Sequence, residues 1–455
     1  MANLLANLDV DAAWQPFEPT RDQPFDRRAA AHLFRRAGFA ATSRELDEAV
    51  KQGPQAAVQQ LLAAPAAHRA FDDEMRKFAQ VTLATGNPEL LTGWWLHRMR
   101  HTPAPLLEKT TLFWHGHFAT SAEKVRDPKL MFEQNELLRT HALGKFEELV
   151  RGIARDPAML LYLDSATNRK IHPNENFARE VMELFALGVG NYSEKDIQEL
   201  ARCFTGWEIQ YGVFKFNSYQ HDYGKKTVLG ASGPMDGDDG LRIILDQPAT
   251  PEFICSKLVR YFVTDDDELP PEFIAPLAKQ FRDAGLTTAP VLQTIFTSRL
   301  FYSDAAIGRK IRSPVELGVG LLRSLEATAN MVQLGGQLRE LGQMVLYPPN
   351  VKGWAGGRAW INSSTLLGRA NVVRALVENP QTQFGGGNLE AYFDRLNLKS
   401  SAALVDFLDE LLLAARLPVA VRTQLVASLD GEQDRPRRFN RLLHLFGSLP
   451  EMQLA

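Results

Sequence analysis

The feature that most constrains the fold is a series of short amphipathic segments that start at proline and stop at glycine or in a polar loop. PELLTGWWLHRMRHT (88–102) and PAPLLEKTTLFWHGHF (103–118) each carry proline in the first turn and apolar residues at helical spacing. Proline suits that turn because the amide it lacks would have no partner inside the helix. Capping-box spacings, as between Thr42 and Glu45, open further segments. The sequence therefore predicts a mainly α, multi-helix globular domain.

Two regions interrupt this pattern. The stretch WEIQYGVFKFN (207–217) is rich in aromatic and β-branched residues, and it predicts a short β segment inside an irregular region at about 205–240. A second irregular stretch, YPPNVKGWAGGRAWINSS (347–364), precedes another helical segment. Long loops in compact domains are more often functional than other connections. We therefore expect both long loops to border the functional site.

The chain is expected to divide into three parts. Residues 1–26 form an N-terminal extension, and residues 27–380 form the helical main domain. Residues 388–455 form a C-terminal helical segment that packs on this domain. The glycine-rich stretch QTQFGGGN (381–388) marks the boundary between the last two parts.

Charge and composition exclude some classes of function. The chain has 51 basic and 54 acidic side chains, a net charge of −3, which argues against nucleic-acid binding because that function needs a basic patch or stripe. No apolar run approaches the roughly 20 residues that span a bilayer, and the first residues lack the pattern of a signal peptide. We expect no transmembrane segment and a cytoplasmic location, although an exported protein whose signal had been removed would look the same. With Cys203 and Cys255 as its only cysteines, the chain offers no disulfide framework or thiolate cluster.

The clearest polar pattern lies in HPNENFAREVMELFALGVG (172–190). On a helical wheel its polar side chains share one arc, called here the polar arc: Glu175, Asn176, Arg179, Glu180 and Glu183. Two interpretations stay open. The arc is a solvated surface with i, i+4 ion pairs, or it faces a second polar layer. In the second case Glu180 and Glu183 are metal ligands or an acid/base pair, and Arg179 positions them or the substrate.

Two histidines one residue apart, in FWHGHFATS (113–121), are candidate metal ligands. On a continuing helix the rings of His115 and His117 would point about 200° apart and could not reach one ion. Gly116 and the residues after it indicate that the helix ends there, and an extended conformation would place both rings on one side. With a carboxylate from elsewhere they would form a 2-His-1-carboxylate site for a divalent metal ion. The alternative is that they join neighbouring helices through buried hydrogen bonds.

The two long loops add further candidates. In the first loop, His221 and Asp222 are candidate metal ligands, although a simple loop turn would also explain them. In the second loop, aromatic side chains beside amide and cationic groups could bind a flat polar ligand such as a sugar, or the tryptophans could anchor the loop to the core. The side chains that we expect to bind substrate are Asn174, Asn176, Lys226, Tyr347, Trp354 and Trp360.

A resemblance to a known family rests on four stretches: LFWHGHFATS, HALGKFEELVRGIARDPAMLLYLD, PNENFAREVMELFALGVGNYSEKDIQELARCFTGW and HDYGKKTVLG. Together they resemble the bacterial family called domain of unknown function 1800, from about residue 27 to about residue 375. The resemblance implies a largely helical fold and a site at the polar arc, but no reaction. Many members of that family begin with an export signal. Their genes are often described beside those of a sulfatase-like family, which implies a sulfatase-like protein as a candidate partner.

Two functions stay open. The first is a metal-dependent enzyme, a hydrolase or an oxidoreductase, that uses a divalent metal ion held by the four candidate ligands. Its polar cleft would be built from residues 113–121, 174–183, 221–227 and 347–362. The second is a non-catalytic binding or scaffold protein, whose polar motif is a buried network and whose tryptophan-rich loop docks a partner or glycan. In both cases the ligand is an unidentified small molecule or a glycan.

Overall fold

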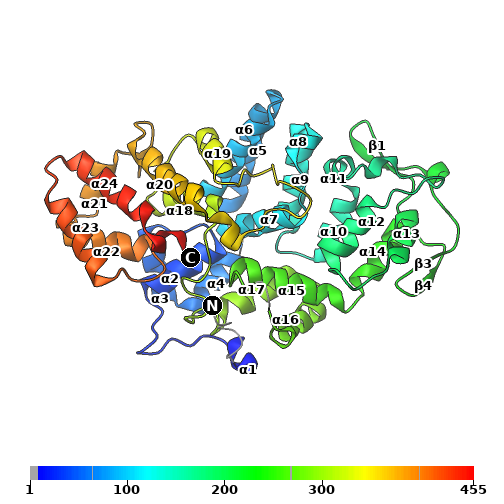
Figure 1. Cartoon of the computed structure of the whole chain (residues 1–455), viewed down its shortest axis with the longest axis horizontal. Coiled ribbons are helices and arrows are strands. Elements are labelled where there is room, and N and C mark those ends of the chain that lie inside the picture. Colours follow the sequence, from blue (N-terminus) through cyan, green and yellow to red (C-terminus); the bar gives the residue numbers. More distant parts are fainter. Residues whose placement is uncertain (1–8, 64, 267–268, 399) are drawn as a thin grey trace.

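The computed structural model describes residues 9–63, 65–266, 269–398 and 400–455, and it confirms the predicted mainly α class (Figure 1). The helices of the first half are α1 (Val10–Ala13), α2 (Arg27–Ala37), α3 (Ser43–Gln52), α4 (Pro54–Leu62), α5 (Ala67–Ala84), α6 (Pro88–His101), α7 (Pro105–His117), α8 (Ala122–Val125), α9 (Pro128–His141), α10 (Phe146–Arg155), α11 (Pro157–Tyr162), α12 (Asn176–Glu180) and α13 (Glu194–Cys203).

The second half is also helical. Its helices are α14 (Gly237–Leu245), α15 (Ala249–Phe262), α16 (Pro271–Asp283), α17 (Thr288–Thr297), α18 (Pro314–Ser324), α19 (Met331–Glu340), α20 (Ser363–Glu378), α21 (Leu389–Arg395), α22 (Ser401–Leu412), α23 (Val419–Asp430) and α24 (Arg435–Ser448).

The strands of the described residues form three antiparallel pairs: β1 (Trp207–Gln210) with β2 (Val213–Phe216), β3 (Lys226–Val228) with β4 (Ala231–Gly233), and β5 (Ala327–Thr328) with β6 (Gln383–Phe384). The first pair is the β segment predicted at 207–217. Its two turn residues, Tyr211 and Gly212, have φ values of 54° and 77°. Two positive φ values match the right-handed twist of the strands that such a short turn joins.

Helix starts follow the predicted capping chemistry. Thr42 and Glu45 form a reciprocal capping box at the start of α3. Ser193 opens α13 in the same way, and Asp236 caps α14. In each case a side-chain oxygen accepts from a backbone amide that has no partner inside its own helix. These boundaries are therefore determined by local interactions.

The body is elongated. Helices α10–α14 and the first two hairpins lie at one end, α21–α24 lie at the other, and α2, α7 and α18 lie between them (Figure 1). The C-terminal helices pack on the rest of the chain, because α24 contacts α20 and α22 contacts α2. In the predicted N-terminal extension, Trp14 Nε1 donates to the carbonyl of Phe273 at 2.9 Å; residues 1–8 lie outside the described residues. Among the described helices, none combines the length and apolar character needed to cross a membrane.

Candidate functional site

The polar arc lies on α12 and continues into a π-helix, labelled η3 (Val181–Ala186). Arg179 donates to Glu175, within the arc, at 3.1 Å. It also donates to both carboxylate oxygens of Glu194, at the start of α13, at 2.9 Å. The charged side chains of the arc are partly exposed. Arg179 thus ties the polar arc to the next helix.

The π-helix is the centre of a polar network. Turns of π-helix are rare in proteins, but those that occur are frequently found at functional sites. Lys257 Nζ, from α15, donates to the carbonyl of Leu184 at 2.9 Å. His117 Nε2, from α7, lies 2.9 Å from the carbonyl of Phe185, and His117 Nδ1 lies 3.3 Å from Lys257 Nζ. Burial, with the charge of Lys257, holds the pKa of His117 well below its ordinary value. The ring is therefore neutral, donates to the carbonyl through Nε2 and accepts from the ammonium group.

Lys257 gives a first testable prediction. Burial, with the charge of Arg260, lowers its pKa to about 8 from 10.5. Because the unfolded chain then binds the proton more tightly, this group stabilises the fold increasingly as pH rises from about 8 to 10.5. We expect the stability of the parent relative to Lys257→Met to grow over that range, by about 1.4 kcal/mol per unit of pKa difference. Urea unfolding of both proteins at about pH 7, 8.5 and 10 measures this growth, and a constant difference would contradict it.

His115 belongs to a separate network. Helix α7 ends at His117, as predicted for this region, but both histidines are still helical, so the extended conformation that would place their rings on one side is not formed. His115 Nε2 accepts from the amide of Leu346 at 3.0 Å. The ring centroid of His115 lies 5.6 Å from that of Trp354. Burial lowers the pKa of His115 to about 3, so this ring is a neutral acceptor that fixes the start of the second long loop.

Close packing explains why the second long loop carries a glycine at position 353. Gly353, in the second long loop, has a φ of 76° and passes directly over the carbonyl of Gly116, where an added Cβ would lie 2.2 Å from the oxygen. The carbonyl of Leu346 accepts from the amide of Ala122 at 2.8 Å, next to the same helix end. The loop is therefore docked on the end of α7.

His221 and Asp222 form a third network. His221 is 3% exposed, and its Nδ1 lies 2.8 Å from the carbonyl of Thr205. The carboxylate of Asp222 accepts from Arg202 Nε at 2.7 Å. Among the residues that the structure describes, no three histidine, cysteine, aspartate or glutamate side chains are placed to hold a metal ion. The four predicted ligands do not fit one shared ion, and the divalent metal stays a prediction.

Three predicted substrate-binding side chains, Asn174, Asn176 and Lys226, form hydrogen bonds with backbone carbonyls of the protein. Asn174 Nδ2 donates to the carbonyl of Asp164, and Asn176 Nδ2 donates to the carbonyl of Leu163, each at 3.1 Å. Lys226 is 1% exposed, and its ammonium group donates at 2.7 Å to the carbonyl that precedes the cap of α14. These contacts hold loops and helix ends in place.

Glu180 connects the polar arc with the second long loop. Burial and the charge of Glu183 raise the pKa of Glu180, while Lys352 in the loop and Arg179 act in the opposite direction. The arc and this loop therefore lie within electrostatic reach of each other. Within the loop, Tyr347 is half-buried under the guanidinium of Arg339, which lies 5.3 Å from its ring centroid.

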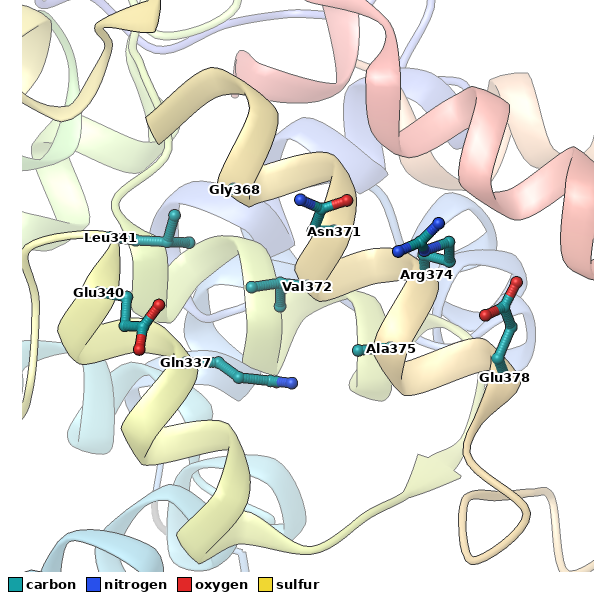
Figure 2. A pocket seen from close by; sticks show the side chains of 9 residues that line it. All are labelled: Gln337, Glu340, Leu341, Gly368, Asn371, Val372, Arg374, Ala375 and Glu378. Atoms are coloured by element: carbon teal, nitrogen blue, oxygen red, sulfur yellow. The ribbon is translucent and has the colours of Figure 1, made fainter. Parts of the chain in front are cut away.

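A cavity of about 430 Å³ lies between α19 and α20, the two helices that the second long loop connects (Figure 2). Trp360 is 7% exposed and packs beside Gly342, so the loop is anchored near the end of this groove. Nine residues line the cavity: Gln337, Glu340, Leu341, Gly368, Asn371, Val372, Arg374, Ala375 and Glu378.

Sequence reasoning missed this cavity. Its lining residues are ordinary helix residues, spread over two segments about thirty positions apart. Helical spacing predicts which residues share a face of one helix. It gives no information on which faces of two helices are opposed. The feature of the sequence that could have indicated the cavity is the long loop that connects these two helices.

A family model described as "Protein of unknown function (DUF1800)" matches residues 32–454. The match includes the polar arc, both long loops and the groove between α19 and α20. No curated protein and no solved structure matches the chain.

Proposed function

Since the chain belongs to the DUF1800 family, whose description assigns no reaction, we propose from the geometry that it is a non-catalytic helical binding protein. In this proposal the groove between α19 and α20 takes a short peptide with free termini. The observation that carries the proposal is the cavity of about 430 Å³, a volume within the range of about 300–1,000 Å³ that ligand pockets have in proteins.

The chemistry of the groove supports a zwitterionic ligand. Glu340, Arg374 and Glu378 are exposed at its rim, and none of them forms an ion pair within the described ranges of the chain. Carboxylates bind an ammonium group, and a guanidinium group binds a carboxylate in a bidentate manner. The rim therefore complements a ligand that carries both charges, as a peptide with free termini does.

The interior of the groove supports the peptide as well. Leu341, Val372 and Ala375 give it an apolar floor. Gln337 projects from α19 across the groove toward α20 (Figure 2). Its Oε1 atom is buried and has no hydrogen-bond partner in the described part of the molecule. Because a buried acceptor without a partner is costly, a backbone amide of the ligand would stabilise this oxygen.

The polar motif supports a structural role beside the groove. His115 and His117 contact backbone groups of the second long loop and of the π-helix. The carboxylate of Asp222 accepts a hydrogen bond from Arg202. Side chains engaged in this manner hold helices and loops in place, and a satisfied polar network specifies one packing arrangement.

Calorimetric titration with a tripeptide that has a leucine side chain and free termini tests the proposal. We expect binding by the parent protein, and at least tenfold weaker binding, about 1.4 kcal/mol, by the Ala375→Trp variant, because the indole would fill the groove. The acetylated and amidated form of the same peptide should also bind at least tenfold more weakly, since its charges are removed.

Val189→Trp is the matched control, because Val189 is 78% exposed and lies outside the groove. It should bind the peptide like the parent. Equal affinity of the parent and Ala375→Trp would contradict the site, and equal affinity for the free and blocked peptides would contradict the zwitterionic ligand.

A further inference from the structure

Four arginine side chains are buried together near the centre of the molecule. This arginine cluster consists of Arg35, Arg36, Arg312 and Arg369. None of them is more than 4% exposed. The first two end α2, the third precedes α18, and the fourth lies on α20. Arg369 Nη2 donates to the carbonyl of Arg312, and the charges of Arg312 and Arg36 act on Arg35, so these like charges lie close to one another.

Backbone oxygens are the main hydrogen-bond partners of this cluster. Arg36 Nη2 donates to the backbone oxygens of Ala306 and Ala455, at 2.6 and 2.7 Å. Arg312 Nε donates to the carbonyl of Leu454 at 2.8 Å. A carbonyl satisfies an N–H group but does not neutralise the guanidinium charge. Apart from the contact with Ala455, these contacts therefore do not balance the charge of the cluster.

Arg35 has the greatest deficit. All three of its guanidinium nitrogens are buried and have no hydrogen-bond partner among the residues described. The same holds for Nε and Nη1 of Arg36 and for Nε of Arg369. Buried polar groups in folded proteins are nearly always hydrogen-bonded. Six buried nitrogen atoms without a partner, on three arginines of one cluster, therefore indicate a missing acceptor.

The nearby carboxylates are already engaged. Glu316 pairs with Lys109, and Asp265 pairs with Lys310. Both carboxylates act electrostatically on Arg36. Apart from Ala455, two lysines and four arginines thus share two carboxylates, which leaves an excess of buried positive charge.

We propose that the arginine cluster binds a small inorganic oxyanion, phosphate or sulfate, through Arg35 with Arg36 and Arg312. Guanidinium groups keep their charge in proteins, and their fork of N–H donors matches the oxygens of a tetrahedral anion. Burying such charges without a counter-ion is strongly unfavourable, and one oxyanion supplies both the charge and the missing acceptors. The site is independent of the groove between α19 and α20.

Anion content is the direct test. The protein is purified in chloride buffers free of phosphate and sulfate, unfolded in acid, and the released ions are measured by ion chromatography. We expect close to one oxyanion per chain, and the ion found distinguishes phosphate from sulfate. Protein refolded without either anion should unfold at a lower temperature, and adding back the ion should restore it. The proposal would be overturned if the parent contained no anion and its unfolding temperature did not change on addition of phosphate or sulfate.

Two variants localise the site. Arg35→Leu should retain less than a tenth of the anion and lose the dependence of its unfolding temperature on phosphate or sulfate. Arg44→Leu is the control, because Arg44 lies on α3 with 84% of its side chain exposed, and it should behave like the parent. If Arg35→Leu retains the anion, the assignment is wrong. If that variant does not fold, the anion content of the parent decides.

The terminal carboxylate of a chain that ends at Ala455 is the competing source of negative charge, because Ala455 lies within the cluster. Appending two residues after Ala455 separates the two sources. We expect the extended protein to keep its oxyanion and its response to phosphate or sulfate. A parent without an inorganic anion, combined with an extended protein of lowered stability, would assign the charge to the chain and overturn the proposal.

Discussion

Replacing Glu108 by glutamine is expected to destabilise the protein by about 3–5 kcal/mol, the usual cost of removing one partner from a buried ion pair. Glu108 is fully buried on α7. Its carboxylate accepts from Arg98, from Arg139 at 2.6 and 3.1 Å, and from Trp95 Nε1 at 3.1 Å. The substitution keeps the shape of the side chain but leaves two buried guanidinium groups without this shared counter-ion. The free energy of unfolding in urea measures the loss.

The same carboxylate makes stability depend on pH. Burial alone would raise its pKa, but the charges and hydrogen bonds of Arg139 and Arg98 outweigh burial and lower the pKa to about 2 from 4.5. A depressed folded-state pKa contributes stability that is present above about pH 4.5 and is lost as pH falls through about 2. The parent should therefore lose its advantage over Glu108→Gln in acid. A difference that stays constant between neutral and acidic pH would contradict this role.

Glu89→Gln is the matched control. Glu89 pairs with Arg339 at 3.0 Å, and both side chains are about half exposed. Exposed pairs contribute about 0–1 kcal/mol, so this variant should unfold close to the parent. A loss in Glu89→Gln as large as the loss in Glu108→Gln would show that burial is not the cause.

Replacing Gly353 by alanine is expected to release the second long loop from α7. The positive φ at this position costs alanine about 1–2 kcal/mol. The added Cβ would also lie 2.2 Å from the carbonyl oxygen of Gly116, and overpacking of this kind costs about 1–3 kcal/mol more. Release should expose the peptide bond after Lys352, which is already a surface residue. The rate of tryptic cleavage there and urea unfolding measure the two effects.

The same loop offers the control for Gly353→Ala. Gly356 has a similar φ of 75°, but an added Cβ would meet nothing within 4 Å. Gly356→Ala should therefore lose only the conformational part, about 1–2 kcal/mol, with the loop still docked. Equal cleavage rates in both variants would show that close packing on Gly116 does not hold the loop.

Local chemistry made much of the fold predictable. The helix start at Thr42 was predicted because a capping interaction joins residues three positions apart, and the same local interaction opens α13 at Ser193 and α14 at Asp236. The hairpin at 207–217 was predicted from its strand-forming residues. The polar arc was also visible, since helical spacing alone places its side chains on one face.

The end of α7 was predicted close to where it lies, at His117, from the local propensity of its glycine. Glycine in a helix costs about 1 kcal/mol relative to alanine, so it indicates a break when the chain is considered alone. Gly116 itself is helical, so His115 and His117 contact different parts of the molecule, which the glycine did not indicate. The role of Glu108 could not be predicted from the sequence either, because α7 is buried on nearly every side and has no polar face on which this carboxylate would stand out.

The sequence by itself determined the mainly α class, the capped helix starts and the polar arc, because each depends on residues within a few positions of one another. The tertiary structure decided the rest. It separated His115 from His117, opposed α19 to α20 around a cavity, and gathered four arginines from α2, the start of α18 and α20. These features depend on which helix faces meet, and that choice is made by packing and charge burial between segments far apart in the chain.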